Sequence, residues 1–145
     1  MSKSHRFMAR IYWEDTDAAG IVYYANYLRF LERARSDLVR RAGIDQAALL
    51  DNEGVLFPVR HCEIDYLIPA RLDDEIEVRT SIRKLGGASM DMNQNIHRGT
   101  KTLVKAKVRL ACTGAGGRPR RIPAEVRAAL SQIELPDTKS DLGTE

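Results

Sequence analysis

Cysteine and long apolar runs are scarce in this chain of 145 residues. Its two cysteines, Cys62 and Cys112, lie far apart without the spacing of a metal or redox motif. Each falls on the apolar side of an alternating pattern, so we interpret both as buried, reduced thiols. No segment approaches the ~20 consecutive apolar residues of a membrane span, and the N-terminal residues lack the apolar core of a secretory signal. These absences predict a cytoplasmic protein with no membrane span.

The chain also carries only a small excess of charge of one sign. The net charge is +3, which is compatible with an anionic ligand such as a nucleotide phosphate but too weak to indicate nucleic acid. The interleaved aromatic and basic residues of a nucleic-acid module are missing too, so we expect no nucleic acid among its partners. The length suits one domain, which we predict over residues 1–135, followed by a polar, flexible tail over residues 136–145.

Metal-binding motifs are missing as well. The segment Asp15–Gly20 begins like a calcium loop, but the fifth and twelfth positions of that pattern are Ala19 and Asn26. There is no HExxH motif or Cys/His cluster for zinc, because the three histidines are scattered at positions 5, 61 and 97. We therefore predict no metal and no cofactor.

The chain also lacks the familiar motifs of catalytic nucleophiles and of phosphate-binding loops. The chain has no GxSxG, and His61 and Cys62 are strand neighbours whose side chains point to opposite faces. His61 and His97 fall on the polar phase of their strands, which favours surface positions. The glycine-rich segment Gly114–Arg118 lacks the spacing of a phosphate loop and is better interpreted as a flexible basic turn.

Helical periodicity runs from about residue 22 to residue 41. Tyr27, Leu31, Ala34 and Leu38 form one apolar stripe. The first half of this helix is apolar nearly all round, which predicts burial on every side, and its charged second half must reach water. Weaker helical patterns cover residues 45–52 and 126–133.

Alternating patterns predict strands near residues 7–13, 62–66, 76–82, 90–96 and 104–112. No helix separates the last four, so we predict an α+β fold with a mainly antiparallel sheet of about five strands. The last four strands should form consecutive hairpins, and the first strand is available to join them. One such sheet cannot cover a helix that is buried on all sides, which indicates a second subunit.

Three acids crowd the segment Glu14–Asp17, immediately before an uncharged run that extends to Arg29. The structural interpretation is that one acid caps the helix and others shape the turn. The functional interpretation is a reacting carboxylate, because an acid at this place lies near the free N–H groups and the positive end of the helix dipole. Three acids are more than capping needs.

These residues resemble a known family. The segment Tyr12–Leu28 is similar to the signature of the hot-dog-fold acyl-CoA thioesterases, in the branch of the 4-hydroxybenzoyl-CoA and Tol–Pal-associated acyl-CoA thioesterases. The segments Glu32–Arg35 and Pro69–Asp74 support the resemblance, which extends from Phe7 to Ile133. It implies an antiparallel sheet wrapped around one long central helix. It also implies pairing of subunits into a continuous sheet as a dimer or a dimer of dimers, with active sites between subunits.

The resemblance also implies the chemistry. The family's catalytic aspartate falls on Asp17, as a nucleophile or a general base, and its carbonyl-polarising group falls on the backbone N–H of Tyr24. The neighbouring residues Gly20, Val22 and Tyr23 fall in the substrate-binding part of the motif. The expected substrate is an acyl-CoA, with acyl carrier protein thioesters as a second class.

Two positions depart from the family pattern. The Tol–Pal branch commonly has histidine where this chain has Tyr24, so no role of a histidine side chain carries over. The basic cluster that binds nucleotide phosphates in the hydroxybenzoyl branch is replaced by Leu85–Ala88, with Arg83 and Lys84 nearby as substitutes. The alternative function is a non-catalytic acyl-CoA or acyl carrier protein binding or scaffold protein associated with envelope maintenance.

Overall fold

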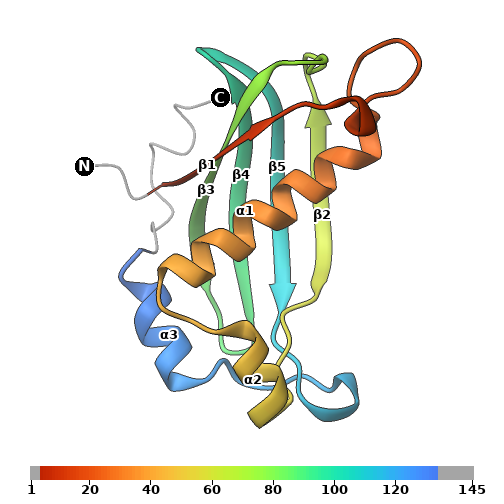
Figure 1. Cartoon of the computed structure of the whole chain (residues 1–145). Coiled ribbons are helices and arrows are strands. Elements are labelled where there is room, and N and C mark those ends of the chain that lie inside the picture. The colour runs from red at the N-terminus through yellow and green to blue at the C-terminus, as the bar shows by residue number, and fades with distance from the viewer. Residues whose placement is uncertain (1–3, 134–145) are drawn as a thin grey trace.

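One long helix lies across the face of a five-stranded antiparallel sheet in the computed structural model, which describes residues 4–133 (Figure 1). The strands are β1 (His5–Arg10), β2 (Val59–Tyr66), β3 (Glu75–Leu85), β4 (Ser89–Arg98) and β5 (Lys101–Ala111). The long helix is α1 (Tyr27–Arg41), and the shorter helices are α2 (Gln46–Glu53) and α3 (Ala124–Ser131). The predicted α+β fold is confirmed. The predicted tail at residues 136–145 lies outside the described residues.

The order of the strands corrects part of the prediction. The sheet runs β1-β3-β4-β5-β2, so β3–β4 and β4–β5 are hairpins, but β2 does not pair with β3. Instead β2 pairs with β5, and β1 pairs with β3. Residues 67–74 carry the chain from β2, at one edge of the sheet, to β3, next to the strand at the other edge, across the upper end in Figure 1. Alternation along a strand reveals its two faces but not its partners, so the sequence pattern could not distinguish these arrangements.

The helix begins later than predicted. Val22 forms an extended bridge with Thr16, and Tyr24–Asn26 form a 3-10 turn before α1 begins at Tyr27. The prediction that an acid caps this helix is wrong, because its N-cap is Asn26 and no side-chain capping bond forms there. Asp15 closes a separate 3-10 turn instead, accepting a hydrogen bond from the Tyr12 N–H at 2.8 Å.

The predicted apolar stripe of the helix is buried against the sheet. Tyr27, Leu31, Ala34 and Leu38 are each at most 3% exposed. Burial on every side is not found within one chain, because Leu28 remains 46% exposed. The helix packs against one face of a single sheet and leaves its other side uncovered. Cys112 is buried and Cys62 is half-buried, both as free thiols.

Candidate active site

Asp17 opens a tight loop that returns at Val22. The Asp17 N–H donates to the Ile21 carbonyl at 2.9 Å, and the Gly20 N–H donates to the Asp17 carbonyl at 3.1 Å. Gly20 has φ +79°, a left-handed conformation that favours glycine. The Asp17 carboxylate is exposed, and its Oδ1 accepts a hydrogen bond from the Ala19 N–H at 2.8 Å. Within residues 4–133 its Oδ2 has no hydrogen-bond partner, so the carboxylate is oriented by one oxygen and open at the other.

A turn at Tyr23–Asn26 follows this loop and precedes α1. Tyr23 is extended, and Tyr24 is the first residue of the 3-10 turn, where a backbone N–H has no acceptor within its own turn. The carbonyl of Asp15 accepts two hydrogen bonds from this turn, from the Tyr23 N–H at 3.0 Å and from Asn26 Nδ2 at 3.0 Å. These bonds fix the acidic segment and the start of the helix relative to each other.

Four tyrosines gather around this turn. The ring of Tyr24 lies 5.1 Å from that of Tyr23 and 6.0 Å from that of Tyr66, the latter in an edge-to-face arrangement. Tyr66 in turn lies 5.6 Å from Tyr27. Tyr23, Tyr24 and Tyr66 are 47%, 62% and 44% exposed. An exposed aromatic surface is a place where apolar ligand groups or another protein surface can bind.

Tyr27 differs from the other three because it is buried. Its hydroxyl accepts a hydrogen bond from the Ala70 N–H at 2.9 Å. Burial is the main cause that raises the pKa of Tyr27, and the bond from Ala70 acts in the opposite direction. The phenol is therefore neutral at physiological pH and serves as a fixed acceptor.

The structure separates the two groups of predicted site residues. Asp17, Gly20, Val22, Tyr23 and Tyr24 come together in the loop and turn. Arg83 and Lys84 lie near the other end of β3, since β3 begins at Glu75 beside the end of β1, and eight residues of strand span roughly 26 Å. Arg83 is only 8% exposed, whereas Lys84 is exposed. Within one chain, these two cations do not reach the Asp17 loop.

Sequence reasoning missed the residues that support this site. Tyr66 lies on the apolar phase of β2, but only the strand order reveals that it contacts Tyr24. The sequence indicates that the segment Pro69–Asp74 is a turn and part of the family resemblance. Its backbone in fact accepts a hydrogen bond from the Val22 N–H, at the Ala70 carbonyl, and donates one from the Leu72 N–H to the Gly20 carbonyl.

None of the helices within residues 4–133 is long and apolar enough to cross a membrane. No group of three or more His, Cys, Asp or Glu side chains in that range is placed to share a metal ion.

Comparison with known proteins agrees with this architecture. Residues 11–130 match the model of the thioesterase-like superfamily. Acyl-CoA thioesterase YbgC of Haemophilus influenzae is 40% identical over 129 residues, which cover 88% of this chain and 95% of that protein. A crystal structure of a probable thioesterase from Bartonella henselae is 42% identical with a TM-score of 0.79, and the match covers 83% of this chain and 99% of that one.

A more distant structure supports the fold alone. A 1,4-dihydroxy-2-naphthoyl-CoA thioesterase from Synechocystis has a TM-score of 0.83 at 19% identity, covering 92% of this chain and 99% of that one. An antiparallel sheet packed against one long helix, shared with these structures, is the hot-dog fold. This chain belongs to the thioesterase-like superfamily. The predicted fold, family and class of enzyme, a thioester hydrolase, are confirmed.

Proposed function

We propose that this enzyme hydrolyses acyl-CoA thioesters to a free acid and CoA, with Asp17 as the reacting carboxylate and the backbone N–H of Tyr24 as the group that polarises the carbonyl. One observation carries the proposal. An exposed carboxylate, oriented through one oxygen by the Ala19 N–H, lies in a loop that is hydrogen-bonded to the turn bearing the Tyr24 N–H. The 40% identity to proteins named acyl-CoA thioesterases supports the choice of substrate.

The chemistry follows from these two groups. A thioester oxygen at the Tyr24 N–H receives a donor aimed at its developing negative charge, a type of interaction worth ~3–4 kcal/mol in catalysis. Asp17 then attacks the carbonyl carbon to form an anhydride that water hydrolyses, or it removes a proton from an attacking water. The CoA sulfur leaves with the electron pair of the broken C–S bond. A thiol has a pKa of ~8.5, so the thiolate leaves without a strong acid.

The surroundings supply surfaces for the substrate. Gly20, Val22 and Tyr23 border the loop and turn. We propose that Gly20 and Tyr23 contact the thioester end of the substrate, whereas Val22, which is only 3% exposed, supports them from the core. The exposed rings of Tyr24 and Tyr66 offer an apolar surface to the acyl group. Acyl carrier protein thioesters, a cytoplasmic location and association with a Tol–Pal system are further parts of the proposal that rest on the family resemblance.

We further propose that the enzyme works as a homo-oligomer joined at the free edge of β2. Val59, Tyr66, Leu67 and Ile68 lie along or just beyond this edge strand and are 36–51% exposed. An open edge with exposed apolar side chains is a natural pairing surface. A two-fold axis that keeps both long helices on one face of a continuous sheet makes the two β2 strands antiparallel.

That symmetry also determines where Arg83 and Lys84 lie relative to the Asp17 of the other subunit. It brings the end of the partner's sheet that carries Arg83 and Lys84 to the same side as Asp17. We propose that such basic residues, with Lys84 as the exposed one, reach the CoA phosphates from another subunit of a dimer or a dimer of dimers. A charged group from another chain would explain why neither cation lies near Asp17 within one chain.

A thiol-release assay tests the proposed function. The purified protein is incubated with short-chain, long-chain and aromatic acyl-CoAs, and free CoA is measured with a thiol reagent. Multiple-turnover release with at least one acyl-CoA supports the proposal. Saturable binding of acyl-CoA with no release of thiol would overturn it and favour a binding or scaffold protein.

A further inference from the structure

We propose that Asp74 and Arg98 are positioning residues that fix the catalytic geometry by holding the segment Pro69–Asp74 against both halves of the site. This inference rests on the function proposed above for Asp17 and Tyr24. Neither Asp74 nor Arg98 belongs to the loop and turn that carry those two groups, so they act through the segment that they hold.

The segment Pro69–Asp74 contacts the two halves of the site through different backbone groups. Its Ala70 carbonyl accepts from the Val22 N–H at 2.9 Å, and its Leu72 N–H donates to the Gly20 carbonyl at 3.1 Å. Both bonds reach the loop that carries Asp17. Its Ala70 N–H donates to the buried Tyr27 hydroxyl at the start of α1. The relative position of the carboxylate and the helix start therefore depends on where this segment lies.

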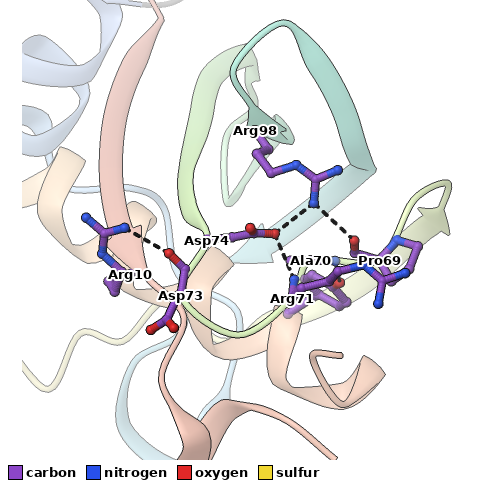
Figure 2. A network of polar contacts seen from close by, with 8 residues as sticks. Arg10, Pro69, Ala70, Arg71, Asp73, Asp74 and Arg98 are labelled. Carbon is purple, nitrogen blue, oxygen red and sulfur yellow. Dashed lines mark hydrogen bonds and ion pairs between the residues drawn. The ribbon is translucent and has the colours of Figure 1, made fainter. Parts of the chain in front are cut away.

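Arg98 at the end of β4 holds both ends of the segment (Figure 2). Its Nη1 lies 2.7 Å from Asp74 Oδ2 and 3.4 Å from the Pro69 carbonyl oxygen. The same Asp74 oxygen accepts a hydrogen bond from the Arg71 N–H at 2.8 Å, which closes the turn from within. The Arg98 guanidinium thus joins Pro69 and Asp74, the first and last residues of the segment, to β4, the central strand of the sheet.

The pair is more shielded than an ordinary surface ion pair. The side chains of Arg98 and Asp74 are 31% and 22% exposed. The chemically similar pair Arg109–Asp91, which links β5 to β4, is 54% and 32% exposed. Exposed pairs contribute little, and shielding from water strengthens the attraction. The structure therefore contains a matched control pair outside the proposed site.

The turn also needs to be held, because its backbone is strained. Asp73 has φ +71° and is the one residue other than glycine with positive φ within residues 4–133. Its carbonyl accepts a hydrogen bond from Arg10 Nη1 at 2.8 Å, and its N–H donates to the Ile11 carbonyl at 2.9 Å. A strained turn persists when its surroundings fix it, so loss of the Asp74–Arg98 pair is expected to let the segment shift.

A small shift has a large catalytic consequence. A displacement of about 1 Å between reacting groups can cost ~10²-fold in rate. The acyl group and the CoA phosphates are proposed to bind surfaces that this segment does not hold, so a positioning defect should lower kcat much more than it raises KM. A purely structural role would instead lower thermal stability and leave kcat unchanged while the protein is folded.

The experiment compares R98M, D74N and R98K with the control variants R109M and D91N. Thiol release is measured at a temperature where circular dichroism shows each variant folded. We expect R98M and D74N to lower kcat by ~10- to ~100-fold with KM changed by less than ~3-fold. Lysine keeps the charge beside Asp74, so R98K should recover part of that loss. R109M and D91N should keep the wild-type kcat.

Two results would overturn the inference. One is a wild-type kcat in folded R98M and D74N, and the other is an equal loss of kcat in R109M. The variant D17N, assayed in parallel, separates this inference from the proposed function. If D17N loses activity and R98M does not, only the positioning role fails, whereas an active D17N means that the proposed function of Asp17 fails.

Discussion

The buried hydroxyl of Tyr27 accepts a hydrogen bond from the backbone N–H of Ala70 across 43 positions of the chain. This contact ties the first residue of α1 to the connection between β2 and β3. It explains why a tyrosine, with its polar end, occupies a position on the buried stripe of the helix.

Replacement of Tyr27 by phenylalanine tests this contact. The change keeps the ring and leaves the buried Ala70 N–H without an acceptor, a loss that costs about 1–3 kcal/mol of unfolding free energy. Urea denaturation of Y27F measures the effect. The exposed Tyr23 accepts no side-chain hydrogen bond within the described residues, so Y23F should match the wild type. Equal stability of Y27F and the wild type would contradict this account of the contact.

The burial of His97 predicts how the free energy of unfolding depends on pH. Its polar phase on the strand predicts a surface position, but His97 is half-buried on β4. Burial, followed by the Arg79 charge, lowers its pKa from the usual value. The unfolded chain therefore binds more protons than the folded one just below the normal histidine pKa of ~6.5. This contribution to stability is present above pH ~6.5 and is lost as the pH falls through the lowered pKa of the folded state.

Chemical denaturation between pH 5 and pH 8, values chosen to bracket ~6.5, measures that dependence. The unfolding free energy of the wild type should fall as the pH decreases. H97Q should remove part of the slope, because glutamine does not titrate. An unchanged slope in H97Q would rule out His97 as its source.

The free edge of β2 is tested by placing a charge on it. Leu67, just beyond β2, and Met8, on β1 at the opposite edge, are both 51% exposed. L67E should weaken the proposed oligomer, because a carboxylate would have to be buried at the interface. M8E should leave it intact. Light scattering after size-exclusion chromatography measures the mass of each variant, and a smaller mass for M8E alone would place the interface at the other edge.

Gly20 is expected to matter for activity more than for stability. Its φ of +79° strains any other residue, while an added Cβ would meet no atom within 4 Å. G20A should therefore cost only about 1 kcal/mol in stability through backbone strain. The same strain would shift the loop that carries Asp17, and kcat should fall.

Gly116 provides the matched control for this variant. It has φ +71°, again with no atom within 4 Å of an added Cβ, and it lies in the turn Ala115–Gly117. G116A should lose similar stability and keep the wild-type kcat. Equal kcat values for G20A and G116A would show that the conformation of Gly20 does not control the reaction.

The sequence predicted the elements well because each has a local cause. The stripe of Tyr27, Leu31, Ala34 and Leu38 and the alternation in β5 reflect burial of one face, which periodicity reports directly. The partner of β2 and the start of α1 depend on contacts between distant segments. Asp15 accepts bonds from the turn at Tyr23, and Val22 bonds to Ala70, and no local pattern contains either pairing.

The residues of the candidate site divide in the same way, into those that a local pattern reveals and those that depend on contacts between distant segments. The segment Asp15–Tyr24 could be recognised because its residues are consecutive, so its chemistry and its resemblance are both local. Tyr66, Asp74 and Arg98 belong to three other parts of the chain, and only the fold brings them to the site. The charge of Arg83 predicts a phosphate-binding residue, but its place in the fold buries it.

The most direct test of the central claim is the rate of thiol release by D17N. Asparagine keeps an oxygen that can accept the Ala19 N–H, so the variant should fold with a melting temperature close to that of the wild type. It should lose about 10³-fold or more in kcat/KM, because it removes the reacting carboxylate. The neighbouring E14Q changes the same charge at an exposed position and should keep wild-type activity. Hydrolysis of acyl-CoA by folded D17N at the wild-type rate would contradict the account.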